Sequence, residues 1–137
     1  MRPKSIVTFE RLALLSLAIA LIVTAVTWGP TVAAFRRSGY GLSIPVLATV
    51  FEFGVGLVLI YFISRKGNRI AKWILAVLTA ASVVEFALRA GNGISGDWVS
   101  IAEIAKILLL VAAVCLLFTA DAKPWFARRG GEGQPAL

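Results

Sequence analysis

Four long apolar stretches, separated by short polar segments, dominate the hydropathy pattern of this chain of 137 residues. They cover about 9–28, 43–62, 70–90 and 98–119. Each is about 20 residues long, which for a helix rising 1.5 Å per residue matches a hydrocarbon core of roughly 30 Å. The pattern therefore predicts four membrane-spanning helices. The first is expected to end at Gly29-Pro30 and to be retained, because its apolar region is too long for a signal peptide.

The segments between the apolar stretches are short, which limits how the helices can be arranged. Gly67-Asn68 gives a helix stop and a turn between the second and third stretches. Short connections place consecutive helices antiparallel and adjacent. We therefore expect an all-α membrane protein, an up-down antiparallel four-helix bundle, as a single domain over 1–127. The Gly- and Pro-rich tail 128–137 is predicted to be a disordered cytoplasmic segment.

Composition agrees with a membrane location. Hydrophobic residues make up 59% of the chain, mean hydropathy is +0.88 and only 15% of residues are charged, against about 25% in soluble domains. The absence of histidine argues against haem-type ligation and most zinc or copper sites, so no metal or cofactor is expected. The chain has no Ser/His/Asp set and no phosphate-binding glycine loop, and we expect that it is not an enzyme.

The distribution of lysine and arginine predicts an orientation. A net charge of +7 would suggest nucleic acid in a soluble protein, but in a membrane protein charge placement orients the helices, and no nucleic-acid partner is expected. Ten basic residues lie on the side of both termini and three on the other side, which places both termini in the cytoplasm. The ten are Arg2, Lys4, Arg11, Arg65, Lys66, Arg69, Lys72, Lys123, Arg128 and Arg129, and the three are Arg36, Arg37 and Arg89.

Some of these basic residues lie near Trp73 or Trp125, two tryptophans that are expected at the membrane boundary. Five are candidates for contact with anionic lipid headgroups, at around 1 kcal/mol each. They are Arg65, Lys66, Arg69, Lys72 and Lys123. The alternative is that they only orient the helices. The expected partners are the lipid bilayer and either a second copy of the chain or another membrane protein.

Five charged residues fall inside one half of the predicted membrane region: Glu52, Glu85, Arg89, Glu103 and Lys106. Glu52 and Lys106 are about 14 and 12 Å from the nearer surface, and Glu85 and Glu103 are roughly 7 Å deep. Glu85 and Arg89, at i and i+4, share a helix face, as do Glu103 and Lys106 at i and i+3. The five therefore form a candidate intramembrane polar cluster.

Two interpretations of this cluster stay open. In the first, ion pairs and hydrogen bonds hold the helices together in an interaction or structural component of the membrane. In the second, the charges form a path through a small proton-coupled transporter or channel subunit. That path would use Glu52, Glu85, Glu103 and Lys106.

Glu52 is the most deeply placed of the acids, on a helix face with Ala48 and Gly56. Small residues let helix backbones approach, so this face is expected to meet the other helices. A similar seam of small and hydroxyl residues on the first span contains Ala13, Ser16, Ala20, Thr24 and Thr27. We expect Glu52 to point into the bundle, where it either pairs with Lys106 or is protonated and bonded to a hydroxyl such as that of Thr24.

Three segments, "RPKSIVTFERL", "SRKGNRIAKWIL" and "LLFTADAKPWF", carry a resemblance to a known group. The chain resembles small four-span inner-membrane proteins of Gram-negative bacteria. In that group a basic turn with an Asn leads into an Arg/Lys-Trp-Ile helix start, and the last span ends in a Leu-Leu-Phe run followed by Trp-Phe. The resemblance implies a location in the bacterial inner membrane and implies no activity.

Overall fold

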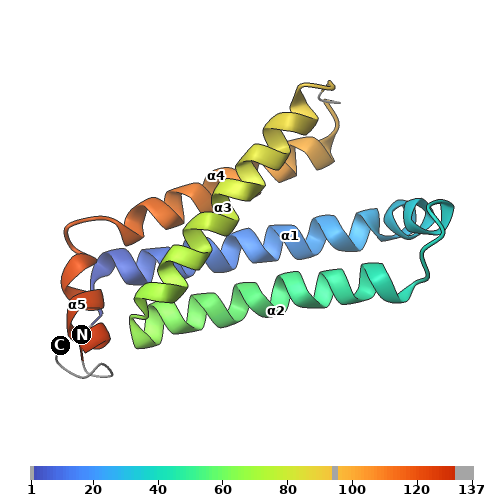
Figure 1. The fold of residues 1–137 in the computed structure, drawn as a ribbon. Coiled ribbons are helices and arrows are strands. Elements are labelled where there is room, and N and C mark those ends of the chain that lie inside the picture. Colours follow the sequence, from blue (N-terminus) through green and yellow to red (C-terminus); the bar gives the residue numbers. More distant parts are fainter. Residues whose placement is uncertain (1, 94–95, 132–137) are drawn as a thin grey trace.

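The computed structural model describes residues 2–93 and 96–131, and it is helical throughout apart from turns and short connections. Its helices are α1 (Lys4–Arg37), α2 (Ser43–Lys66), α3 (Arg69–Ala90), α4 (Trp98–Leu117) and α5 (Lys123–Gly131) (Figure 1). The first four run alternately up and down, and each packs against its neighbours in the order α1, α2, α3, α4 and back to α1. This confirms the predicted all-α four-helix bundle. By length and composition, the four are the helices of a multi-pass membrane protein.

The predicted end of the first span at Gly29-Pro30 is wrong, because α1 continues through Pro30 to Arg37. Proline removes one backbone N–H donor, yet membrane helices tolerate it where neighbouring groups compensate. At 1.5 Å per residue, the 34 residues of α1 span about 51 Å, well beyond a hydrocarbon core of roughly 30 Å. The helix therefore carries its basic last turn out of the apolar layer.

Local signals account for the turn between α2 and α3. Gly67 adopts a left-handed conformation (φ 59°, ψ 36°) that ends α2, as glycine permits without a steric cost. The Asn68 Oδ1 atom accepts hydrogen bonds from the N–H groups of Ile70 (2.8 Å) and Ala71 (3.3 Å), which caps the start of α3. The helix stop and turn predicted from Gly67-Asn68 are therefore confirmed.

The apolar core lies at one end of the bundle, formed by the start of α1, the two helix ends at the α2–α3 turn, the end of α4 and α5. We call this the packed end. Phe9, Ile63 and Leu117 are fully buried there. The other members of the core are Ile6, Ala13, Leu59, Ile60, Ala71, Leu75, Ala113, Ala122, Trp125 and Phe126. Helix α5 follows a short turn and lies across this end, near the start of α1 (Figure 1).

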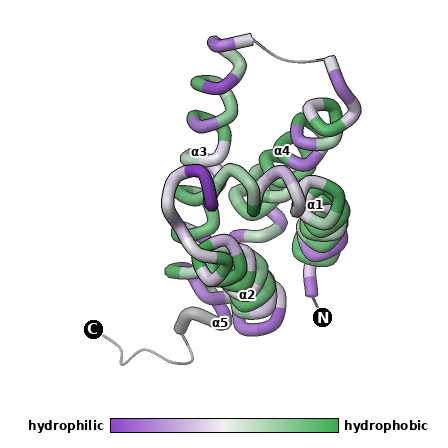
Figure 2. Tube along the Cα trace, turned by 90° about the vertical axis from the view of Figure 1, so that its right-hand side faces the viewer, coloured by the Kyte–Doolittle hydropathy of each residue, from purple (hydrophilic) through white to green (hydrophobic). Residues whose placement is uncertain are grey.

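The opposite end of the bundle is open. The second half of α3 leaves α1 and α2 and stands away from them in both views, with several hydrophilic positions on its exposed turns (Figures 1 and 2). From Ala80 to Arg89 every residue except Phe86 is exposed. We call residues 80–90 the wing. Because α3 meets α2 mainly near their shared turn, the first half of α2 is also largely uncovered.

The predicted disorder from residue 128 onward is wrong for its first residues, since α5 extends to Gly131. Burial of the Trp125 and Phe126 side chains explains why a segment with little apolar periodicity forms a helix here. Pro124 is compatible with it because proline is tolerated in a first turn. Residues 132–137 lie outside the described part of the chain.

Candidate functional site

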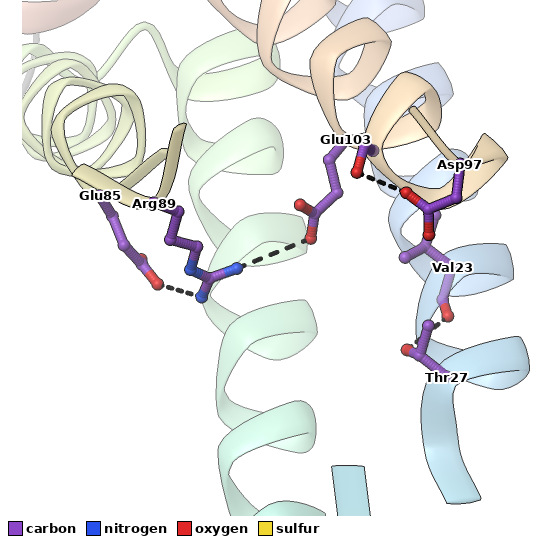
Figure 3. A network of polar contacts seen from close by, with 7 residues as sticks. Val23, Thr27, Glu85, Arg89, Asp97 and Glu103 are labelled. Carbon is purple, nitrogen blue, oxygen red and sulfur yellow. Dashed lines mark hydrogen bonds and ion pairs between the residues drawn. The ribbon is translucent and has the colours of Figure 1, made fainter. Parts of the chain in front are cut away.

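Three of the five charged residues predicted to form an intramembrane cluster come together at the open end. The Arg89 guanidinium lies between two carboxylates, those of Glu85 one turn earlier on α3 and of Glu103 on α4 (Figure 3). It is ion-paired with Glu85, and its Nη1 atom is 3.9 Å from Glu103 Oε1. This contact joins the wing to α4.

The charged trio Glu85, Arg89 and Glu103 is far from buried. The side chains of Glu85 and Arg89 are each 63% exposed, and that of Glu103 is 29% exposed. In water such a pair would contribute little to stability, typically 0–1 kcal/mol. At this depth in a helix that crosses a membrane, the exposed face would meet lipid instead. The trio is therefore a costly arrangement for a helix that crosses a membrane.

Lys106 is not part of the trio. Glu103 and Lys106 share a helix face but do not pair, because within residues 2–93 and 96–131 the Lys106 side chain makes no ion pair or hydrogen bond. Its backbone carbonyl oxygen does accept a hydrogen bond from Ser16 Oγ on α1 (3.1 Å). The small-residue seam predicted on the first span is buried at Ala13, Ser16 and Ala20, and Ser16 faces α4.

The inward placement of Glu52 is also wrong. Its side chain is exposed, and across the described ranges it makes no hydrogen bond or ion pair with Lys106, Thr24 or any other residue. The inner face of α2 passes through Pro45, Thr49 and Phe53 to Ile60, all buried or half-buried, whereas Ala48 is exposed. Of the predicted face of Ala48, Glu52 and Gly56, only Gly56 packs against another helix. A Cβ added there would lie 3.2 Å from Leu17 Cδ2 on α1.

Several polar contacts that sequence reasoning missed lie at the packed end. Glu10 pairs with Arg2, and its Oε1 atom is 3.9 Å from Arg65 Nη2. Asp121 accepts hydrogen bonds from the Ser5 N–H (3.2 Å) and Ser5 Oγ (3.0 Å). The N-cap residue of α1, Pro3, makes no side-chain hydrogen bond to the helix start. The Asp121 carboxylate, 116 residues further along the chain than Ser5, caps it instead. Such a long-range cap has no local sequence signature.

A groove of about 400 Å³ lies between α1 and α2 near the Glu10–Arg65 pair. Leu14, Leu57 and Tyr61 supply its apolar wall. The two charged residues at the groove offset each other, so it offers no net charge to a ligand. No group of three or more metal-ligating side chains is found in the described part of the chain.

Lys72, one of the predicted headgroup contacts, lies against aromatic rings at the packed end. Its Nζ atom is 4.6 Å from the ring centre of Phe118, 4.8 Å from that of Phe126 and 5.8 Å from that of Trp73. Ammonium groups at such distances are attracted to the ring faces. These contacts join α3 to the end of α4 and to α5. Arg65, another predicted headgroup contact, lies near the Glu10 carboxylate.

Comparisons with models of protein families, with curated proteins and with solved structures find no match for this chain.

Proposed function

We propose that the protein is an interaction component of a bacterial inner membrane, and that another membrane-embedded helix packs against its wing. The observation that carries this proposal is the exposure of Glu85 and Arg89, each 63%, on a helix long and apolar enough to span a bilayer. Exposed leucines on such a helix need no explanation, because lipid tails solvate them. Exposed charges do.

The physical argument concerns the cost of those charges in lipid. A charged side chain at the centre of a membrane helix costs about 2.5–3.5 kcal/mol on the insertion scale, and less nearer the surface. The ion pair offsets part of this cost, but lipid tails can donate no hydrogen bond to the remaining carboxylate oxygens. A helix of a second protein chain, with small or hydroxyl residues facing the wing, would replace the lipid and supply donors.

The alternative function, a proton-coupled transporter or channel subunit, has less support. It would need Glu52, Glu85, Glu103 and Lys106 to line one path. Glu52 is exposed on α2, and neither it nor the Lys106 side chain makes an ion pair or hydrogen bond in the described residues. Chains of ionisable groups that pass protons need such contacts, directly or through water.

The mass of the particle extracted with its native lipids tests the proposal. We expect the wild type to contain more than one protein chain and Glu85→Leu/Arg89→Leu to release the single chain of 14.6 kDa. Arg2→Ala/Glu10→Ala is the matched control, since it also removes one ion pair with no change in net charge, at the packed end. Intact masses then distinguish a second copy from a different protein. A wild-type particle with a single chain would contradict the proposal.

The orientation is proposed on the charge bias, with both termini in the cytoplasm and the 36–40 and 91–97 connections in the periplasm. Reporter fusions at Leu137 and near Gly93 test it. We expect a cytoplasmic reporter to be active at Leu137 and a periplasmic one near Gly93. The reverse result would overturn the orientation and would leave the packing against the wing untouched.

A further inference from the structure

Three basic side chains gather at the packed end without a carboxylate partner. Arg69 begins α3, Lys72 follows one turn later and Lys123 begins α5. Arg69 lies three residues before Lys72 on the same helix, and Lys123 lies three residues before Phe126, whose ring centre is 4.8 Å from the Lys72 Nζ atom. In the described residues, none of the three forms an ion pair with Asp or Glu. We call Arg69, Lys72 and Lys123 the cation cluster.

Two described carboxylates at the packed end, those of Glu10 and Asp121, are already engaged. Glu10 pairs with Arg2 and lies near Arg65, and Asp121 accepts two hydrogen bonds from Ser5. Among the residues that the structure describes, the cluster therefore holds three like charges that no carboxylate compensates. The start of α3 adds to the imbalance, because its first turn contains no acidic residue and a helix N-terminus carries partial positive charge. An anion bound here would relieve the repulsion.

Packing keeps the cluster together in spite of that repulsion. The Lys72 ammonium rests against Phe118 and Phe126, and Trp125 anchors α5 by donating a hydrogen bond from Nε1 to the Ile63 carbonyl oxygen (3.1 Å). Fixing α5 in this way holds Lys123 on the helix whose Phe126 ring contacts the Lys72 ammonium. Arg69 and Lys123 remain exposed, so their N–H groups are accessible to a ligand.

The depth of the cluster indicates the source of the anion. Lys72 precedes Trp73, which is 60% exposed at the end of a membrane-spanning helix, where tryptophan lies at the headgroup level. The aromatic rings of Trp73, Phe118 and Phe126 lie beside the ammonium and give it apolar surroundings. Basic residues gathered at this level of a membrane attract anionic, phosphate-bearing headgroups.

We propose that the cation cluster of Arg69, Lys72 and Lys123 is a binding site for the phosphate of an anionic phospholipid headgroup. The site is narrower than a general basic surface, because it contains only three of the five headgroup candidates. Arg65, for example, is not part of it and lies near Glu10 instead. It does not rest on the proposed packing against the wing, which lies at the other end of the bundle. Each of its cations should raise the preference for an anionic lipid by about fivefold.

Native mass spectrometry of protein released from nanodiscs with equal phosphatidylglycerol and phosphatidylcholine tests the site. We expect the wild type to retain phosphatidylglycerol and Arg69→Gln/Lys123→Gln to retain about thirtyfold less of it. Lys4→Gln/Lys66→Gln is the matched control, because it removes two exposed cations near the same end with the same loss of net charge. It should retain most of the phosphatidylglycerol that the wild type retains, because neither lysine belongs to the cation cluster.

Two further arms make the result decisive. Arg69→Lys/Lys123→Arg keeps both charges and should retain the lipid, which separates binding from folding. Excess inorganic phosphate should not displace the lipid. Equal losses in the two glutamine double variants, equal retention of phosphatidylcholine, or displacement by inorganic phosphate would each overturn the proposal. The first two results would leave only non-specific charge attraction, and the third would indicate a site for a free anion.

Discussion

Trp125→Phe tests how α5 is held to the bundle. The indole N–H donates to the carbonyl oxygen of Ile63, in the last turn of α2, and Trp125 is only 8% exposed. The N–H that would continue the helical ladder to this oxygen, that of Gly67, donates to Phe62 instead. Phenylalanine keeps an aromatic ring but has no donor, so the buried oxygen is left without its indole partner. Such a group costs about 1–3 kcal/mol.

The assay is thermal unfolding in detergent, combined with hydrogen exchange of peptides from α5. At roughly 3–5 °C per kcal/mol for a chain of this size, the midpoint should fall by at least about 3 °C. The α5 amides should exchange faster in the variant. Trp98→Phe, at a site 52% exposed, is the matched control and should shift the midpoint by less than about 2 °C. Equal shifts for the two variants would refute the role given to the hydrogen bond.

Two further predictions concern polar contacts in each half of the molecule. Arg89 contacts both Glu85 and Glu103, so Glu85→Leu and Glu103→Leu should each have a small effect on thermal stability. The double variant should lower the free energy of unfolding by at least about 0.5 kcal/mol more than the sum of the two single variants. Additive losses would show that Arg89 does not couple the two acids. Asp121→Ala removes the long-range cap on Ser5 and should destabilise the protein by about 1–2 kcal/mol in the same assay; an unchanged midpoint would exclude that cap.

The sequence was sufficient for the bundle itself. Apolar length predicts the four spans, and Gly67-Asn68 predicts a turn whose chemistry is local. The end of α1 could not be predicted in the same way. A proline usually ends a helix in water, but within a membrane protein the backbone can continue past it, as it does at Pro30.

The candidate site was predicted only in part, for a geometric reason. Spacing along a helix fixes which residues share a face, so the Glu85–Arg89 pair was accessible from the sequence. Which face turns inward depends on the other helices, and two candidate stripes on α2 lie side by side. The stripe through Thr49 and Phe53 is the inner one, and it leaves Glu52 outside. The role of Asp121 depends on the fold of the whole chain.

Photo-crosslinking in intact membranes tests the central claim most directly, with a photoreactive residue placed at one position at a time. Val84 and Leu88 lie on the wing, 58% and 70% exposed, and Leu21 and Ile22 on α1 are matched controls at 58% and 59%. The proposed packing predicts protein–protein crosslinks from Val84 and Leu88, with Leu21 and Ile22 reacting only with lipid. Crosslinks to lipid alone at all four positions would contradict it.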